Sequence, residues 1–234
     1  MKILQKGFNY SQDGPGNRLV YHLQGCNFAC KWCSNADSIP LINPKASDYS
    51  VKELFDEIMR SRMMFFDGGG VTFTGGEVCV QSDELKELLM LLKDNGIHTA
   101  IESNASFLSI RDISPYVDYL IVDFKHYDDE IHQKWIGVSN KSVKENIEYF
   151  FAEGRQIHIR IPVVGGVNDS PQGFAEYFSK LDTQNAVFEF LAYHEFGKDK
   201  WQGKYEIENG FVSAETIKNF TKIFENCGLK TVVT

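Results

Sequence analysis

The sequence predicts an α/β fold in which six βα units build an open barrel of mainly parallel strands with helices outside. Three observations lead to this prediction. Strand and helix patterns alternate along the chain, which is typical of a parallel sheet. Six units are fewer than the eight of a closed barrel, and the polar residues with chemical potential follow the ends of the expected strands. Active sites lie at those ends in such folds.

The expected strands are short apolar runs bounded by turn residues. They cover residues 18–24, 70–73, 98–102, 119–124, 156–164 and 187–192, with one further short run at 229–233. Each of the first six is followed by a helical pattern or by a polar loop. This succession makes a parallel arrangement the simplest reading of the chain.

Helices are expected where capping residues precede apolar positions at helical spacing. Ser50 with Glu53, and Ser142 with Glu145, have the spacing of a capping box, and Ser82 starts a third helix. Two weaker patterns cover residues 171–181 and 213–226. The stripes predicted to face the core are Val51, Leu54, Phe55, Ile58 and Met59, then Ile147, Phe150 and Phe151, and finally Leu85, Leu88, Leu89 and Leu92.

Composition limits the class of protein. The 234 residues are 43% hydrophobic and 24% charged, which suits a single domain over residues 1–234. A net charge of −8 argues against a surface for nucleic acid or anionic membranes. The first residues have too short an apolar run for a signal peptide, and five cysteines, three of them clustered, suit a reducing compartment. We therefore expect a cytoplasmic protein that binds neither nucleic acid nor membranes.

Cys26, Cys30 and Cys33 form a C-x3-C-x2-C pattern within residues 25–35. Three thiolates at this spacing can bind three irons of a cubane cluster and leave the fourth iron open. Zinc is the alternative, although structural zinc usually closes its tetrahedron with a second cysteine pair or a nearby histidine. Unrelated thiols are a third interpretation, whereas an electron carrier would gain nothing from an open iron.

Gly75-Gly76-Glu77 follows the apolar strand at residues 70–73. Two glycines let the backbone approach a ligand closely, and a following carboxylate can accept from an ammonium group. Taken alone, the three residues indicate a simple turn from strand to helix more readily than a ligand site.

The cysteine pattern resembles the signature of the radical S-adenosylmethionine (SAM) enzymes. In that family a [4Fe-4S] cluster binds the amino and carboxylate groups of SAM through its open iron, and the reduced cluster cleaves SAM to a 5′-deoxyadenosyl radical. The resemblance implies a partial (β/α)6 barrel and cluster ligation by Cys26, Cys30 and Cys33. Gly75-Gly76-Glu77 is similar to the family's GGE motif, which meets the amino group of SAM. Val78-Cys79 departs from the relatives, and Cys79 and Cys227 are expected to be inert thiols.

Further segments resemble the activases of glycyl radical enzymes. Residues 96–104 resemble their third-strand segment, and residues 13–16, 119–125, 129–133, 137–140 and 194–201 are similar to matching stretches of pyruvate formate-lyase activating enzymes. The resemblance implies removal of a glycine Cα hydrogen from a partner glycyl radical enzyme of anaerobic metabolism, with a flavodoxin or ferredoxin-type electron donor. The chain has no cysteine between Cys33 and Cys79, and so lacks the ferredoxin-like insertion of many other activases.

The resemblance also implies roles for individual residues. Lys125, counted as catalytic, and His194 would approach the carboxylate, ribose or adenine of SAM, and Asn35 and Arg160 would fix the nucleoside. The further SAM-binding residues implied are Trp32, Gly75, Gly76, Glu77, Ser103, Asn104 and Asp123. A monovalent cation would be held by Glu102, Ser103 and Asp123, with the Ile121 carbonyl contributing, although Glu102 replaces the family's shorter aspartate. Salt-bridged surface residues are the alternative interpretation for the lysine, arginine and histidine.

Two segments are implied as contacts for the partner. Asp13-Gly14-Pro15-Gly16 would belong to the loop that receives the partner's peptide, and residues 194–201 would order around it, with Trp201 offering an aromatic face. An ordinary turn and a plain surface loop are the alternatives. A radical SAM enzyme that acts on a small molecule is the second functional hypothesis, because it would use the same cluster without needing either segment.

Overall fold

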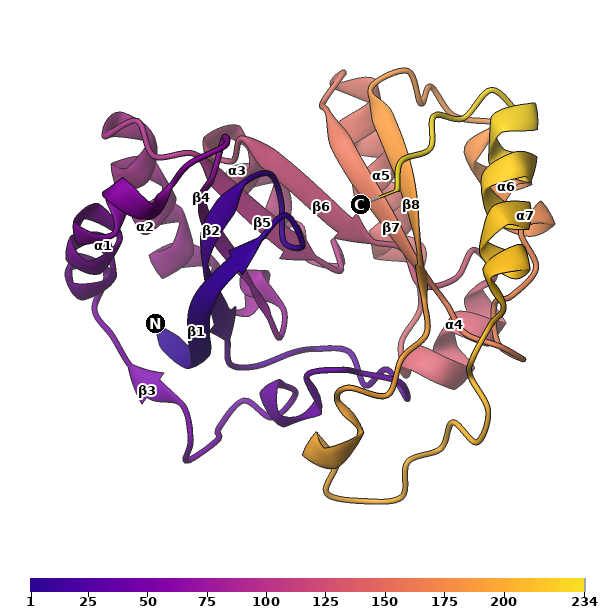
Figure 1. Ribbon diagram of the computed structural model, residues 1–234, viewed down its shortest axis with the longest axis horizontal. Helices are drawn as coiled ribbons and strands as arrows, with labels where there is room; N and C mark the ends of the chain where they lie inside the picture. Colours follow the sequence, from indigo (N-terminus) through magenta and orange to yellow (C-terminus); the bar gives the residue numbers. More distant parts are fainter. Residues whose placement is uncertain (234) are drawn as a thin grey trace. The chain divides into compact units, whose positions relative to one another are not determined.

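Eight strands form an open sheet in the computed structural model, which describes residues 1–233 (Figure 1). The strand order is β3-β1-β2-β4-β5-β6-β7-β8, so β3 and β8 are the two edges, and the predicted α/β class is confirmed. The chain divides into two compact units. The first comprises Met1–Asn27, Asp37–Ser103 and Phe107–Ile121, and the second comprises Phe28–Ala36, Asn104–Ser106 and Val122–Thr234.

The first unit contains an antiparallel hairpin followed by parallel strands. Its strands are β1 (Lys2–Tyr10), β2 (Asn17–Leu23), β3 (Ser47–Asp48), β4 (Gly70–Gly75), β5 (Thr99–Ser103) and the first part of β6 (Tyr119–Asp123). Its helices are α1 (Val51–Arg60), α2 (Ser82–Asp94) and α3 (Ser109–Ile113). Strand β1 runs antiparallel to β2 and β3, whereas β2 pairs with β4, and β4 with β5, in parallel.

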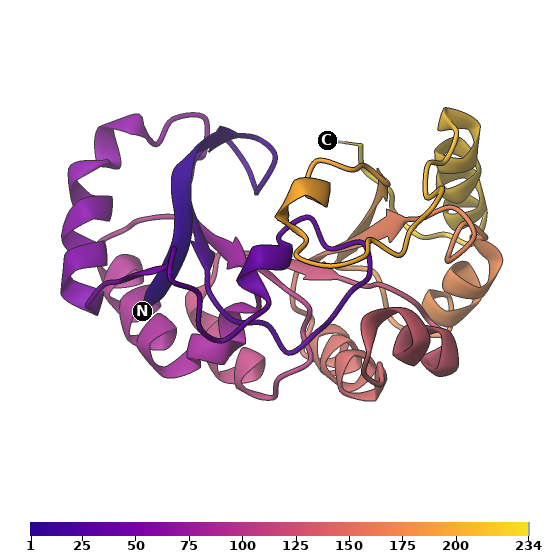
Figure 2. The same ribbon diagram turned by 90° about the horizontal axis from the view of Figure 1, so that it is seen from below.

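The second unit is built on a parallel pair of strands. Its elements are the end of β6, then α4 (Asp129–Ile136), α5 (Lys141–Ala152), β7 (Ile157–Val163), α6 (Gln172–Phe178), β8 (Ala186–Ala192) and α7 (Ala214–Asn226). Strands β7 and β8 are parallel over their full length, and α7 packs against both β8 and α6 (Figures 1 and 2). Short 3-10 turns occur at Ala36–Ser38, Arg62–Met64, Val78–Gln81, Ser114–Tyr116 and Lys198–Lys200.

The predicted apolar stripes face the core where the helices are long. Leu85, Leu88, Leu89 and Leu92 of α2 are completely buried, as are Leu54 and Ile58 of α1. In the second unit the core is aromatic, because Phe178 of α6 meets Phe188 of β8 edge to face at 4.7 Å. Burying each such side chain contributes on the order of 2 kcal/mol, so these contacts hold the helices to the sheet. Among residues 1–233, no helix is long and apolar enough to span a membrane.

One expected strand is absent, and two elements of the structure were not predicted. The hairpin strand β1 was not expected, because most of its side chains are exposed and show no alternation. Residues 229–233 do not form a strand but a single bridge from Thr231 to Phe188. Helix α4 was also not expected, although Asp128 caps its first turn and Gly137 ends it in the left-handed conformation.

The two predicted capping boxes have different outcomes. Ser50 accepts from the Glu53 amide and Glu53 accepts from the Ser50 amide, so the box at α1 is confirmed. Ser142, by contrast, lies inside α5, which begins after Asn140. The Asn140 amide donates to the Asp129 carboxylate at 2.8 Å, and the Asn140 side chain donates to the carbonyls of His126 and Tyr127. These bonds fix the helix start at Asn140, two residues before the predicted cap at Ser142.

We therefore predict unequal effects of the same substitution at the two serines. Ser50→Ala should lower the free energy of unfolding by about 1 kcal/mol, because it removes a cap. Ser142→Ala should change it by less than ~0.5 kcal/mol, because an exposed position inside a helix favours alanine. Urea unfolding followed by circular dichroism measures both, and equal losses would contradict the helix start observed at Asn140.

Candidate active site

The turn after β4 is fastened directly to the end of β2. The Gly76 amide donates to the Leu23 carbonyl at 2.9 Å, and the Glu77 amide donates to the Gly25 carbonyl at 2.8 Å. Gly75 has φ +107°, and a Cβ on Gly76 would collide with the Gly25 carbonyl oxygen. Only glycines fit here, so the motif fixes the residues that immediately precede Cys26.

The Glu77 carboxylate is completely buried beneath this turn. One of its oxygens accepts from the Ser103 hydroxyl at 2.7 Å and from the Cys79 amide at 3.0 Å. Burial and the neighbouring Glu77 charge raise the pKa of the Cys79 thiol, which keeps it protonated. Ser103, one of the expected SAM and cation residues, is thus brought together with the GGE motif.

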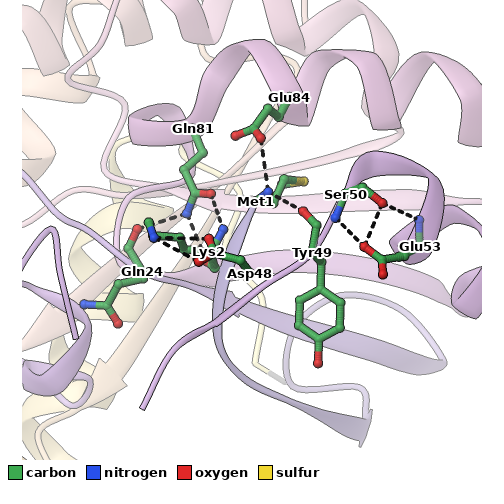
Figure 3. A network of polar contacts seen from close by, with 9 residues as sticks. All are labelled: Met1, Lys2, Gln24, Asp48, Tyr49, Ser50, Glu53, Gln81 and Glu84. Carbon is green, nitrogen blue, oxygen red and sulfur yellow. Dashed lines mark hydrogen bonds and ion pairs between the residues drawn. The ribbon is translucent and has the colours of Figure 1, made fainter. Parts of the chain in front are cut away.

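The Gln81 side chain binds the main chain just before the cysteine loop (Figure 3). The Gln81 side chain donates to the carbonyls of Gln24 and Lys2, both at 3.0 Å, and accepts from the Lys2 amide at 2.7 Å. The buried Gln24 side chain in turn donates to the carbonyls of Asp37 and Pro40. Gln81 was not predicted from the sequence, because a single glutamine at the end of a helical turn belongs to no recognisable motif.

The Asp13-Gly14-Pro15-Gly16 turn precedes β2, whereas Cys26 follows it. Strand β2 spans seven residues, so roughly 20 Å of strand lies between the two. The completely buried Arg18 donates to the Pro15 carbonyl at 3.0 Å, and the Thr72 hydroxyl donates to the Asp13 carbonyl at 2.7 Å. The turn is therefore held to the first unit through its main chain, while the Asp13 side chain accepts from Asn9.

The rest of the cysteine loop belongs to the second unit and is tied to the end of α4. The amides of Ala29 and Lys31 donate to the carbonyls of Ile136 and Trp135, at 2.9 and 3.0 Å. The Cys33 amide donates to the Cys30 carbonyl at 3.1 Å, which closes a turn between the two thiols. Trp32, which stands between these two cysteines in the sequence, is buried.

Lys125 provides the positive charge beside these thiols. Its ammonium lies 2.8 Å from the Asp123 carboxylate. Burial disfavours the ammonium form of Lys125. The negative charge of Asp123 and of the ionised sulfurs of Cys30 and Cys33 favours that form more strongly, so the pKa of Lys125 is raised. Asn168 donates to the Lys125 carbonyl at 2.9 Å, so the lysine is positioned through its main chain as well.

Arg160 belongs to a buried charge network that the sequence did not reveal. Its Nε donates to Glu189 at 2.7 Å, and His158 Nε2 lies 3.0 Å from the same oxygen. Burial opposes ionisation of Glu189, but the hydrogen bonds and charges of His158 and Arg160 lower its pKa. The signal that could have indicated Glu189 is a carboxylate inside the apolar run Val187-Phe188-Glu189-Phe190.

The remaining expected residues have local partners. Asn104 accepts from the Ser106 amide and hydroxyl, and Glu102 accepts from the Thr74 hydroxyl at 2.7 Å. His194 stacks on Phe196, with ring centroids 4.5 Å apart, and partial burial lowers its pKa. The first unit thus gathers Cys26, Gly75, Gly76, Glu77 and Ser103, and the second gathers Cys30, Cys33, Asn35, Asp123 and Lys125.

The donor set fits an iron–sulfur cluster bound by three cysteines. None of the five cysteines forms a disulfide within the described residues, and Cys26, Cys30 and Cys33 follow directly from main chain that is fixed by the contacts above. Within residues 1–233, no three His, Cys, Asp or Glu side chains are gathered into a preformed metal site. Soft thiolates are the ligands that iron–sulfur clusters require, whereas the carboxylates of Glu102 and Asp123 suit a hard cation.

Comparison with protein families assigns the class. The model of the Radical SAM superfamily matches residues 20–178, which is more than half of the chain. This range includes the three cysteines, the glycine turn, Asp123 and Lys125. Membership of this class implies a [4Fe-4S] cluster and SAM as cofactors.

Individual relatives narrow the assignment. The chain is 32% identical over 204 residues to the pyruvate formate-lyase-activating enzyme of Streptococcus mutans, covering 82% of this chain and 77% of the relative. It is 34% identical over 200 residues to the pyruvate formate-lyase 1-activating enzyme of Escherichia coli K12, covering 81% and 79%. The chain therefore belongs to the radical SAM superfamily and, within it, to the family of the pyruvate formate-lyase-activating enzymes.

Solved structures agree with the fold. A domain of a pyruvate-formate lyase-activating enzyme from Bacteroides vulgatus matches with a TM-score of 0.59 and 26% identity, covering 71% of this chain and 99% of that one. Streptococcus suis SuiB matches with a TM-score of 0.70 over 92% of this chain and 48% of that one. Its identity is 16%, so this second match concerns the fold alone.

We predict different outcomes for two buried cysteines. Cys30→Ala should abolish iron and sulfide binding while the fold is retained, because two thiolates cannot hold the cluster. Cys79→Ala should leave cluster content unchanged and lower the free energy of unfolding by roughly 1 kcal/mol, because it only opens a small cavity. Iron and sulfide assays after anaerobic reconstitution measure the first effect. Loss of the cluster in Cys79→Ala would instead make Cys79 a ligand.

Proposed function

We propose that this protein activates a glycyl radical enzyme, with residues 1–234 acting as one radical SAM domain in the cytoplasm. The observation that carries the proposal is the cysteine loop, in which three cysteines outside any disulfide follow main chain that is fixed by the glycine turn and by the end of α4. Relatives named pyruvate formate-lyase-activating enzymes, aligned over more than four fifths of the chain, support it.

The cofactors supply the radical chemistry. When bound and reduced, the cluster cleaves SAM to methionine and a 5′-deoxyadenosyl radical, which takes a Cα hydrogen from a glycine of the partner protein. In this proposal the chain holds the cluster through Cys26, Cys30 and Cys33. The main chain at Gly75 and Gly76 contacts the amino group of SAM. Such binding and orientation are what a protein contributes to cofactor chemistry.

Charged residues of the second unit orient the rest of SAM in this proposal. Lys125 directs its ammonium to the SAM carboxylate, since Asp123 and Asn168 already position it. Arg160 contacts the nucleoside, and Glu189 fixes the direction of its guanidinium. Trp32, Asn35, Asn104 and His194 complete the SAM site.

A monovalent cation is a further part of the proposal. Glu102, Ser103 and Asp123 supply oxygen ligands, together with the Ile121 carbonyl, and oxygen is what a hard cation prefers. Each of the three side chains already has a local partner, namely Thr74, Glu77 and Lys125. Binding of the cation would therefore exchange some of these contacts.

The protein partners follow from the same function. The substrate is a glycyl radical enzyme of the pyruvate formate-lyase type, whose glycine loop would reach residues 13–16 and 194–201. A flavodoxin or ferredoxin-type protein would reduce the cluster.

The deciding experiment is anaerobic reconstitution followed by reduction and addition of SAM, with and without a pyruvate formate-lyase-type partner. We expect a glycine-centred doublet in the electron paramagnetic resonance spectrum that requires the partner. A matched control replaces the partner's radical glycine with alanine, which should abolish the doublet. SAM cleavage without a doublet would favour a small-molecule substrate, and a zinc-loaded protein without a cluster would overturn the assignment.

The partner contact at the Asp13 turn can be tested separately. Asp13→Ala should lower glycyl radical formation about tenfold and leave SAM cleavage without partner nearly unchanged, if its carboxylate meets the partner peptide by a charge-assisted hydrogen bond. Asp48→Ala is the control, because Asp48 is an exposed acid of the same unit paired only with a surface lysine. Equal loss of both activities would place Asp13 in the SAM site instead.

A further inference from the structure

A segment after β8, residues 195–206, crosses back onto the cysteine loop and is called the strap here. It makes four contacts with that loop inside the second unit. The contacts join Gly197 to Ser34, Lys200 Nζ to Asn35 Oδ1 at 2.9 Å, Trp201 Nε1 to the Cys33 carbonyl at 3.0 Å and Glu206 to Lys31 at 2.7 Å. The strap therefore holds the loop at residues 31 to 35.

The contact at Cys33 differs from the others because it fixes a cluster ligand. The Cys33 amide already donates to the Cys30 carbonyl, so its own carbonyl is the remaining main-chain group. The Trp201 indole donates to that carbonyl. Because the amide and the carbonyl of Cys33 are both hydrogen-bonded, the backbone torsions that set the direction of the Cys33 side chain are restrained.

Trp201 is itself held from the sheet. Its ring meets Tyr205 edge to face at 5.4 Å, and the Tyr205 hydroxyl lies 2.8 Å from that of Tyr193. Tyr193 is buried at the end of β8, where its amide donates to the Val163 carbonyl at 3.0 Å. A continuous series of contacts thus runs from β7 and β8 to the cysteine loop.

We propose that Trp201 is a positioning residue for Cys33, a role that rests on the proposed cluster at the three cysteines. Its indole N–H donates to the Cys33 carbonyl of the loop, and the Lys200 ammonium donates to Asn35. A ligand loop that is held in this way keeps its thiolate on the iron when the loop would otherwise open.

The test compares two identical changes at different tryptophans. Trp201→Phe removes the N–H and keeps an aromatic ring. Trp135→Phe makes the same change in a residue whose contacts with Lys31 of the loop use its main-chain carbonyl and its ring face, not the indole N–H. Reconstituted holoproteins are challenged anaerobically with an iron chelator, and loss of the brown absorbance is followed. We expect Trp201→Phe to lose its cluster about fivefold faster, the factor that corresponds to a hydrogen bond of ~1 kcal/mol, and Trp135→Phe to match the parent.

A second readout does not depend on the cluster. In apoprotein, alkylation by iodoacetamide, measured by mass spectrometry of the peptides, should accelerate at Cys33 in Trp201→Phe and stay unchanged at Cys26. A purely structural role would raise both rates together, and unfolding would also expose the buried Cys79. If Trp201→Phe unfolds, Tyr205→Phe replaces it and should accelerate Cys33 alkylation in the same direction.

The outcomes separate this role from the proposed function. Equal cluster loss in the two tryptophan variants, or an unchanged ratio of Cys33 to Cys26 alkylation, overturns the positioning role while the parent cluster and SAM cleavage stand. A parent protein that binds no cluster overturns the proposed function itself. The alkylation ratio then still decides whether Trp201 restrains Cys33.

Discussion

The close approach of two backbones is the constraint on which the site depends. The amide of Gly76 donates to the carbonyl of Leu23, the last residue of β2, and the amide of Glu77 donates to that of Gly25 just beyond it, and no side chain fits between the two backbones. This contact fixes the point where the chain leaves the sheet toward Cys26. It also turns Glu77 inward, where burial without partners would cost several kcal/mol. The hydroxyl of Ser103 and the amide of Cys79 supply those partners, so the turn and its surroundings require one another.

The second unit fixes its part of the site by different means. Here the end of α4 and the strap both bind main-chain groups of the cysteine loop. The end of α4 does so through its carbonyls and the strap through the Trp201 indole, and both segments are distant from the loop in the sequence. The pKa of Lys125 is raised despite burial, chiefly because the Asp123 carboxylate lies beside its ammonium. Arg160 is paired with Glu189. Buried charge is costly unless paired, which explains why both cations have a fixed carboxylate partner.

Local sequence rules succeeded where one element decides the outcome and failed where two compete. The capping box at Ser50 forms because Ser50 and Glu53 bind each other's amides at the first turn of α1. The same pattern at Ser142 does not form, since the Asp129 carboxylate binds the Asn140 amide and the helix starts there. Strand β1 was missed for a related reason, because a strand with mostly exposed side chains owes its conformation to pairing with β2 and β3 rather than to its own sequence pattern.

The sequence alone determined the fold class and the family, and it located the thiols, glycines and lysine that are proposed for the site. These follow from spacing along the chain, which short-range geometry and the order of strands translate directly into structure. Only the tertiary structure decided that Ser103 supports Glu77, that Glu189 holds Arg160 and that Trp201 holds Cys33. Each of these pairs joins residues more than 25 positions apart. Such contacts depend on how distant segments pack, and local patterns carry no record of that packing.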